Sequence, residues 1–498
     1  MGRLYINIDT TTHTIPFLKR VCEAGNVVKE MLYPMADMYA GTDVTDVLFD
    51  VFCQFSITKS GIFEDFDAKM NKKSENGIQV DYSDRDDFST ASVLWNKWGI
   101  DPYRVWIERT REKGMNPWLS FRMNDCHCPY DETSWIRDEV FYEARENGEM
   151  LGEEYGYYKN CYNFRFEKYR NKLLSYIKEQ LGRYDVYGVE LDFMRDATCF
   201  RYLHDDMDEC RGIMNGYMAE IKAAVSDAEA SRGHSIKILV RLPRGRKQSF
   251  DMGFDAAFWA DAGLVDIIVP TSRWGSSDSG ISVDDWKETG AEITVGIETL
   301  VDGSVSPMKV MNTETARGQA ASYLAAGSDG IYFYNYFSNP DCRSNPDVDI
   351  FCHPYPRNYS VYVSCGSLEK LQAMPLRFVV IPQIDDFGGT VEAWNPYKRE
   401  GNYEFEIITG KLPEGKQGFV IIGFEKGDGD VYINGEKCTG YRNISMSYLP
   451  GIGEQPSDYE SGNAEYRLYN VHSLSDYVQK IEVKSSDAKV SWVELYTI

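Results

Sequence analysis

The chain has 498 residues, of which 43% are hydrophobic and 14% aromatic, and its formal net charge at pH 7 is −24. This length suits two or three domains, or one barrel-sized domain with an accessory domain. So acidic a chain is not expected to bind nucleic acid or an anionic membrane as its main partner.

The N-terminal stretch MGRLYINIDTTTH contains no apolar signal core, and Ile6 does not fit a myristoylation signal. No apolar run reaches the roughly 18 residues that a transmembrane helix needs. The eleven cysteines are an odd number without a disulfide-like spacing, which favours reduced thiols. We therefore expect a cytoplasmic protein.

Apolar runs of strand length recur along the chain, with helical patterns between several of them at 166–184, 209–230 and 313–327. The runs are 3–9, 46–52, 116–123, 186–193, 237–243, 266–272, 292–298 and 330–336. Eight strands, each followed by a helix or a long loop, predict an α/β fold of the (β/α)₈ TIM-barrel type. The alternative is a doubly wound open sheet, but no glycine-rich phosphate turn follows the first strand.

Two connections are long, 53–115 and 124–185, and both follow the carboxyl end of a predicted strand. Segments of this length often carry binding surfaces, so we expect them to form walls over the active face. After about residue 375 the helical periodicity stops, and short alternating runs begin, separated by turns such as GDGD and NGEK. We predict a catalytic barrel over 1–375 and a β-sandwich-like accessory domain over 376–498.

Chemistry in a (β/α)₈ barrel lies at the carboxyl ends of the strands and in the loops that follow them. The candidate side chains at these positions are Asp9, His13, Arg122, Asn124, His127, Glu190, Asp192, Arg195, Arg241, Arg244, Arg273, Trp274, Glu298, Asn335 and Tyr336. The arginines indicate an anion site, because a guanidinium binds carboxylate or phosphate in a bidentate manner. The alternative is pairing with neighbouring acids. Those pairs would be Arg195 with Asp192 or Asp196, and Arg122 with Asp125.

Two pairs of acid–base groups offer different chemistry. Glu190 alternates with Asp192 on one strand and, together with Glu298, fits the layout of many retaining glycosidases. Glu190 would otherwise hold an arginine in place. Asp9 and His127 fit another scheme, in which a carboxylate orients an imidazole that activates water, although a hydrogen-bonded loop histidine is the simpler interpretation.

A metal site is not expected. The sequence Cys126-His127-Cys128 has no second Cys or His pair at ligand spacing, and no cofactor motif is present.

The pattern resembles glycoside hydrolase family 156. The resemblance rests on Asp9 at the end of the first strand, Arg122 with His127 after the third, the stretch GVELDFMR with Arg195 in the fourth, and Asn335 at the eighth. GVELDFMR alone recurs in other barrel hydrolases. The five-residue spacing of Arg122 and His127, together with Arg195, is the more specific part.

That family consists of inverting exo-sialidases with a (β/α)₈ barrel and a β-rich accessory domain. The resemblance implies that Asp9 and His127 act on the attacking water. It also implies that Arg122 and Arg195 hold the carboxylate of sialic acid and that Asn335 contacts the sugar. Further substrate contacts are predicted at Asn124, Glu190, Asp192, Arg241, Arg273 and Trp274.

The implied substrate is a sialylated glycan or sialoside, and a homodimer is compatible with the sequence. Three other functions stay open at this point. They are a retaining barrel glycosidase that uses Glu190 and Glu298, a lyase acting on a phosphosugar or uronate, and a non-catalytic protein that binds an acidic sugar.

Overall fold

The computed structural model describes most of the chain. The described residues are 2–8, 17–18, 21–22, 24–65, 90–127, 134, 136–273, 278–298, 300–301, 309–310, 313–334, 337–339, 352–354, 359–382, 398–399, 402–444, 465–485 and 487–498.

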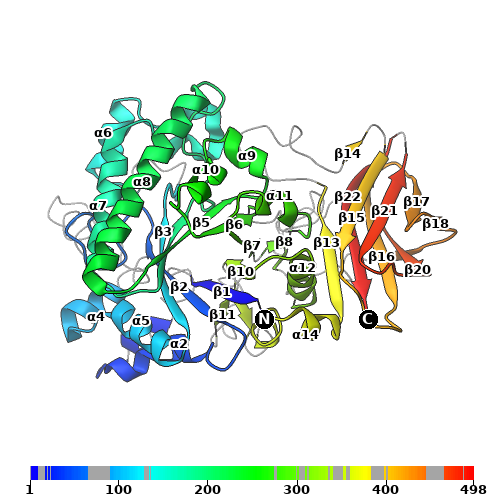
Figure 1. Cartoon of the computed structure of the whole chain (residues 1–498), viewed down its shortest axis with the longest axis horizontal. Coiled ribbons are helices and arrows are strands. Elements are labelled where there is room, and N and C mark those ends of the chain that lie inside the picture. Colours follow the sequence, from blue (N-terminus) through cyan, green and yellow to red (C-terminus); the bar gives the residue numbers. More distant parts are fainter. Residues whose placement is uncertain are drawn as a thin grey trace. The chain divides into compact units, whose positions relative to one another are not determined.

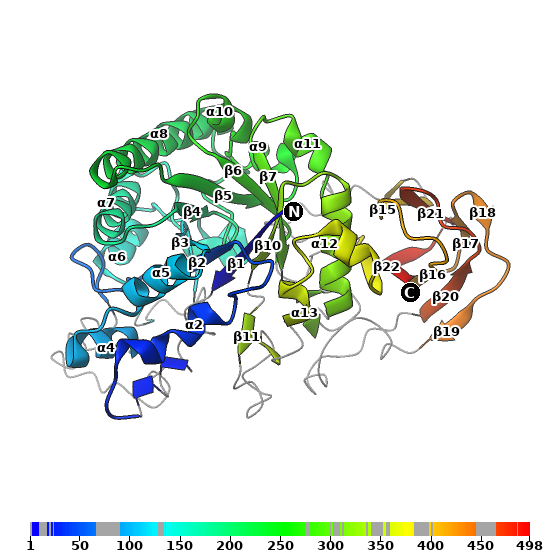
Figure 2. The same cartoon turned by 60° about the horizontal axis from the view of Figure 1, so that its bottom comes forward.

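Eight strands close into a barrel in the order β1-β10-β7-β6-β5-β4-β3-β2, which confirms the predicted fold class. They are β1 (Arg3–Ile8), β2 (Asp46–Phe52), β3 (Asn116–Arg122), β4 (Gly188–Asp192), β5 (Lys237–Pro243), β6 (Ile267–Thr271), β7 (Glu292–Glu298) and β10 (Gly330–Tyr334). The registers of β1 to β5, and of β7 with β10, are parallel. Figure 2 shows strands β2 to β6 with the helices outside them.

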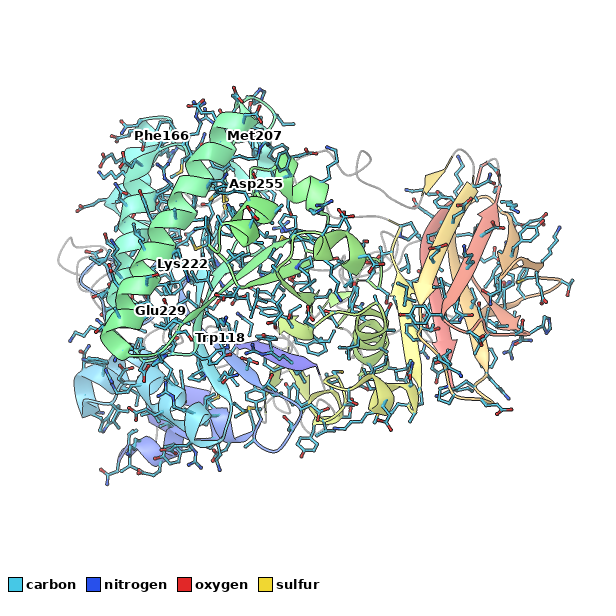
Figure 3. The ribbon with its side chains drawn as sticks, viewed as in Figure 1. Trp118, Phe166, Met207, Lys222, Glu229 and Asp255 are labelled. Atoms are coloured by element: carbon cyan, nitrogen blue, oxygen red, sulfur yellow. The ribbon has the colours of Figure 1, made fainter. Side chains whose placement is uncertain are left out.

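The barrel strands are buried on both sides, which explains their nearly continuous apolar sequences. Where polar groups enter the interior they bind one another: the amide of Asn7 donates to Glu190 at 2.8 Å and to Ser120 at 3.2 Å. Gly188 on β4 leaves room for the ring of Trp118 on β3, which Figure 3 labels, because a Cβ at Gly188 would lie 2.1 Å from the indole Cζ3.

The helices confirm the three predicted helical segments and add shorter ones (Figure 1). The longer ones are α4 (Thr90–Trp98), α5 (Pro102–Glu112), α6 (Glu139–Glu146), α7 (Glu167–Arg183), α8 (Met207–Arg232) and α12 (Thr313–Ala325). The shorter ones are α2 (Pro34–Asp37), α9 (Arg246–Asp251), α10 (Ala256–Asp261), α11 (Val283–Lys287), α13 (Tyr359–Tyr362), α14 (Leu368–Gln372) and the 3₁₀ helices η2 (Lys29–Leu32) and η3 (Glu153–Asn160).

Local signals fix where α8, the longest helix described, begins and ends. The carboxylate of Asp206 accepts hydrogen bonds from the backbone N–H groups of Asp208 and Glu209 at its start. At its end Gly233 adopts φ 79°, a left-handed conformation that glycine takes without steric cost. The helix lies beside α7, and the two follow β4 and β3 along the chain.

The C-terminal part forms two five-stranded antiparallel sheets, as predicted for a β-sandwich. One has the order β13-β22-β16-β20-β19, with β13 (Leu376–Val380), β16 (Gly418–Lys426), β19 (Arg442–Ile444), β20 (Glu465–Val471) and β22 (Lys489–Thr497). The other has the order β14-β15-β21-β17-β18, with β14 (Lys398–Arg399), β15 (Asn402–Ile408), β17 (Asp430–Ile433), β18 (Glu436–Lys437) and β21 (Val478–Lys484). Exposed and buried residues alternate along β15 and β21, so each strand presents one face to the core.

The chain packs as two compact units, one of 5–269 with 287–292 and the other of 1–4, 270–286 and 293–498. In the second unit α12 lies against β13. A Cβ at Gly318 of α12 would lie 2.1 Å from the carbonyl oxygen of Arg377 on β13. The domain boundary between 375 and 376 stays a prediction.

The remaining described strands are two short pairs, β8 (Leu300–Val301) with β9 (Lys309–Val310) and β11 (Phe337–Asn339) with β12 (Cys352–Pro354). Among the described helices, none combines the length and the apolar character that crossing a membrane requires.

Candidate active site

The loop after β3 is held by buried side chains on either side. The carboxamide of Asn124 donates to the backbone oxygens of Tyr162 and Thr198, at 2.9 and 2.8 Å, and its oxygen accepts from the N–H of Tyr162 at 3.0 Å. The N–H of Cys126 donates to the carboxylate of Asp196 at 2.7 Å. These contacts fix the shape of the loop and therefore the position of the next residue, His127.

Asp125 is the centre of the cluster and is fully buried. Its Oδ1 contacts the Nδ1 of His127 and accepts the backbone N–H of the same residue at 2.9 Å. Its Oδ2 lies 3.4 Å from a terminal nitrogen of Arg122 and 3.8 Å from the Nε of Arg195. Burial alone would raise the pKa of Asp125, but the attraction of His127, Arg195 and Arg122 outweighs it and holds the pKa well below its usual range. Asp125 is therefore an anion.

Arg122, the last residue of β3, is held inside the protein, with 2% of its side chain exposed. Its Nε lies 3.2 Å from the carboxylate of Asp50 on β2, and Nη1 lies 3.7 Å from the Sγ of Cys53. The pairing of Arg122 with Asp125 that the sequence offered as the structural alternative is therefore present, with Asp50 as a second acid. A buried arginine between two carboxylates has little freedom to move.

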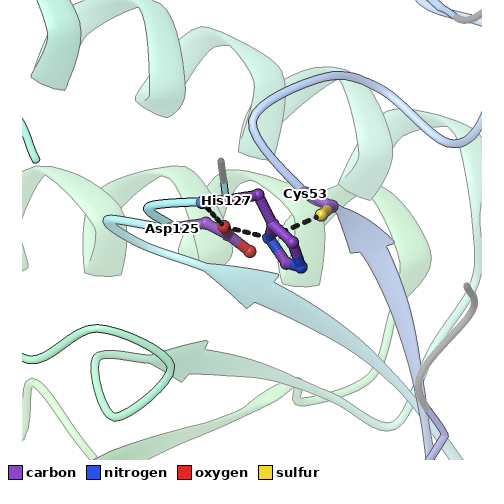
Figure 4. Close-up of side chains that lie close together, drawn as sticks. All are labelled: Cys53, Asp125 and His127. Carbon is purple, nitrogen blue, oxygen red and sulfur yellow. Dashed lines mark hydrogen bonds and ion pairs between the residues drawn. The ribbon is translucent and has the colours of Figure 1, made fainter. Parts of the chain in front are cut away.

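The imidazole of His127 is more accessible, with 33% of the side chain exposed. Figure 4 shows its Nδ1 facing both Asp125 and Cys53, whose Sγ is 3.3 Å away. Its Nε2 lies 3.2 Å from the Nη2 of Arg195. Its backbone oxygen accepts from Arg137 at 3.0 Å, which ties the loop to the segment before α6.

Cys53, Asp125 and His127 also offer three atoms of the kinds that bind zinc, all within 4.8 Å of one another. The guanidinium of Arg122 contacts the same thiol and carboxylate, and that of Arg195 lies 3.8 Å from the carboxylate. Because their positive charges oppose a cation at this point, we interpret the three residues as a hydrogen-bonded group.

A second buried ion pair fixes the backbone at Arg195. Arg241 on β5 binds Asp192 on β4 through two contacts, of 2.8 and 2.9 Å, and neither side chain is exposed. The Oδ1 of Asp192 also accepts the backbone N–H groups of Met194 and Arg195, at 2.9 Å each. The predicted pairing of Arg195 with Asp192 thus involves its backbone, while its guanidinium, 13% exposed, turns to Asp125 and His127.

Among the predicted site residues, the structure brings Arg122, His127 and Arg195 into one cluster. Asn124 lies in the wall of the loop, Asp192 and Arg241 form the support, and Glu190 lies in the barrel interior on the amide of Asn7. Contacts of these four residues with substrate stay predictions. Arg244, Arg273 and Glu298 are buried after or at the ends of β5, β6 and β7. Asp9, His13, Trp274, Asn335 and Tyr336 lie outside the described residues.

Sequence reasoning did not place Asp50, Cys53 and Arg137 in the site, and it named Asp125 only as a partner of Arg122. One signal was available: Asp50 interrupts the apolar run DVLFDVF, and an acid inside a buried strand needs a partner. Asp125 stands two residues before His127, a spacing at which an aspartate often binds local groups. No sequence signal points to Arg137.

No family model matches the sequence, and no curated protein matches it significantly. Solved structures with a similar fold include alpha-L-fucosidase isoenzyme 2 from Paenibacillus thiaminolyticus, at 14% identity and TM-score 0.41 over 67% of this chain and 45% of that one. They also include an alpha-L-fucosidase from Bacteroides thetaiotaomicron, at 12% identity and TM-score 0.39 over 97% and 93%. A third is the catalytic domain of beta-amylase from Paenibacillus polymyxa, at 10% identity and TM-score 0.39 over 74% and 98%. This chain spans less than half of the first of these, and no substrate or mechanism is taken from them.

Proposed function

We propose that the protein is a glycoside hydrolase, an exo-sialidase that releases terminal sialic acid from glycans with inversion of the anomeric configuration. The observation that carries the proposal is the setting of His127, which has ionised Asp125 at Nδ1 and Arg195 at Nε2. A base for water and a guanidinium for an anion thus lie side by side. The resemblance of Arg122, His127 and Arg195 to the family 156 pattern supports the same function.

A sialoside carries its carboxylate on the anomeric carbon itself, so an arginine that binds the carboxylate also places the reacting centre. In the proposed step a water gives a proton to Nε2 of His127, while its oxygen bonds to the anomeric carbon on the face opposite the aglycone. The bond to the aglycone breaks, and its electron pair leaves with the aglycone oxygen, which takes a proton from solvent water, while His127 returns its proton to solvent after the step. Asp125 stabilises the imidazolium that forms. A single displacement of this kind inverts the configuration.

Other predicted residues, including the second predicted catalytic residue, also have roles in the proposal. Asp9 acts with His127 on the water, and Asn335 contacts the sugar. Asp192 and Arg241 act through Arg195 as positioning residues, because their buried pair fixes the backbone at that position.

We expect the protein to hydrolyse a fluorogenic α-sialoside and to leave neutral glycosides and a glucuronide intact, with or without a chelator. Proton NMR of the first product should show the β-anomer of sialic acid, since no side chain bonds to the sugar. Early accumulation of the α-anomer would contradict the mechanism. Hydrolysis of a neutral glycoside instead would favour the retaining alternative through Glu190 and Glu298, and binding of a sialoside without turnover would favour a sugar-binding protein.

Replacing Arg195 with Ala should lower kcat/KM for the sialoside roughly tenfold to a few hundredfold, because a partly buried charge-assisted pair contributes about 1.5–3 kcal/mol. Arg195→Lys should restore only part of the loss, since an ammonium cannot bind a carboxylate in a bidentate manner. The control is the sialoside methyl ester, which lacks the anion. It should be a poor substrate for the unaltered protein and lose little more in Arg195→Ala. Equal losses for the ester and the acid would mean that Arg195 does not bind the carboxylate.

A further inference from the structure

We infer that Gln54 is a positioning residue for His127, because its side chain, together with Arg137, fixes the main chain of the loop that carries the imidazole. The contacts themselves stand on the geometry of the described residues. Their effect on catalysis rests on the proposed function, because it requires His127 to act on the reacting water.

Gln54 has a backbone conformation that its residue type rarely adopts. Among the described residues, Gln54, at φ 60°, and Asn434, at φ 51°, are the two non-glycine residues with a positive φ. Asn434 forms the two-residue turn between β17 and β18 with Gly435, at φ 82°, and asparagine tolerates the conformation that such a turn requires. Glutamine does not share this tolerance, so its presence at position 54 costs free energy.

The chain reverses direction at Gln54, directly after β2. Phe52 pairs with Ser56 in the antiparallel sense, and the N–H of Cys53 donates to the backbone oxygen of Phe55 at 3.1 Å. Gln54 is the middle residue of this reversal, where a glycine would adopt the same conformation without steric cost. The reason for a glutamine at this position must therefore lie in its side chain.

The side chain of Gln54 joins this reversal to the loop after β3. Its Nε2 donates to the backbone oxygen of Asp125, and its Oε1 accepts from Nη1 of Arg137 at 2.8 Å. An amide nitrogen can only donate and an amide oxygen can only accept, so both ends of the side chain are used correctly. Nη2 of Arg137 donates in turn to the backbone oxygen of His127 at 3.0 Å. The two side chains thus hold the carbonyl groups on either side of Cys126.

The loop is fixed at three consecutive residues through its main chain. Between the two carbonyl groups, the N–H of Cys126 donates to the carboxylate of Asp196 at 2.7 Å. Arg137 is itself buried, and its guanidinium lies over the ring of Phe141 in α6, 4.2 Å from the ring centroid. The Nδ1 of His127 contacts a carboxylate of the same loop, so a change in the main chain would turn the imidazole away from that carboxylate.

The first test measures the loop without any substrate. Hydrogen–deuterium exchange of peptides, followed by mass spectrometry, reports how firmly the N–H groups of Cys126 and His127 are bound. In Gln54→Gly we expect these amides to exchange roughly threefold to tenfold faster, because a hydrogen bond that holds the loop is lost. A peptide that covers β4 is the internal reference and should exchange at an unchanged rate. The urea midpoint should stay close to that of the unaltered protein, because the strain that glycine relieves offsets the lost hydrogen bonds.

The second test is steady-state hydrolysis of an α-sialoside. Gln54→Gly should lower kcat roughly tenfold to a hundredfold, because a small misplacement of a catalytic group can cost about 10²-fold. KM should change little, since the arginines that bind the anion are not altered. A role in stability alone would instead lower the urea midpoint and leave kcat of the folded protein unchanged.

Two further variants separate the reach of the side chain from the strain of the backbone. Gln54→Asn keeps an amide and suits the left-handed conformation, but it is one methylene too short to join Asp125 to Arg137, so it should lose as much kcat as Gln54→Gly. The matched control is Asn434→Gly, which places glycine at the other left-handed position and should change neither kcat nor the exchange of the loop. The inference is overturned if Gln54→Asn keeps the kcat of the unaltered protein, or if kcat of Gln54→Gly falls without faster exchange of the loop.

These results are separable from the proposed function. Faster exchange of the loop in Gln54→Gly of a protein that hydrolyses no sialoside would keep the hold of Gln54 on the loop and overturn the substrate. Hydrolysis of sialosides at the same kcat by Gln54→Gly and the unaltered protein would keep the function and overturn the role of Gln54.

Discussion

Replacing His127 with Ala is expected to lower kcat/KM for a sialoside by roughly 10²–10⁴-fold, the usual loss when a general base is removed. The fold should survive, because the side chain is one-third exposed and the loop is held by Asn124 and Asp196 through other contacts. Asp125→Asn should lose a similar factor, since the neutral amide no longer stabilises the imidazolium. Asp9→Asn is expected to behave in the same way if Asp9 acts on the water.

The measurement is steady-state hydrolysis of a sialoside, with circular dichroism to confirm that each variant is folded. Glu190→Gln is the matched control, because glutamine keeps an oxygen that can accept the hydrogen bond from Asn7, while the charge is lost and an NH2 group replaces the other oxygen. It should remain active, as should Glu298→Gln. If Glu190→Gln and Glu298→Gln were inactive while His127→Ala stayed active, catalysis would instead be assigned to Glu190 and Glu298 in a retaining mechanism.

The second large effect is on stability. Arg241→Met should lower the free energy of unfolding by about 3–5 kcal/mol, because it leaves the carboxylate of Asp192 buried without its charge partner. Adding Asp192→Asn should recover part of the loss, since asparagine removes the charge and still accepts the N–H groups of Met194 and Arg195.

Urea denaturation followed by tryptophan fluorescence measures the change. The matched control is Arg109→Met, which breaks a bidentate but partly exposed pair with Asp37 and should lower the free energy of unfolding much less, because solvent screens an exposed pair. If Arg241→Met lowers the free energy of unfolding no more than Arg109→Met does, the ion pair of Arg241 with Asp192 does not stabilise the structure around Arg195.

The barrel was predictable from sequence because parallel strands buried on both faces must be apolar throughout, and eight such runs appear at helical intervals. The sandwich was predictable for the opposite reason, since strands such as β15 expose every second residue. Arg122, His127 and Arg195 could be singled out as candidates because side chains at the carboxyl ends of barrel strands usually face the active side, and the structure brings these three into one cluster.

The partners of these residues were harder to predict because they depend on register and on loop shape. Asp50 meets Arg122 only because β2 lies beside β3 in the closed barrel. Asp192 faces Arg241 because β4 and β5 pair at that register, which the sequence does not fix. Among the described residues, the carboxylate that contacts His127 is Asp125. Asp9, which the strand ends suggested, lies outside them and stays a prediction.

The contact between α12 and β13 determines whether the barrel and the C-terminal sheets could be exchanged separately during evolution. Gly318 brings the helix backbone against Arg377, and the guanidinium of Arg377 joins Glu314 of the helix, at 2.9 Å, to Glu494 of β22, at 2.5 Å. Nine residues of α12, among them Ala316, Ala320 and Ala321, are buried, so the helix has little solvent-facing surface of its own. Exchange of the C-terminal sheets for another module by recombination would remove Arg377 and Glu494 together, strip this helix of its cover and leave Glu314 without its partner. We therefore expect the two parts to have evolved as one heritable unit, with glycine retained at 318 wherever the sheets are present.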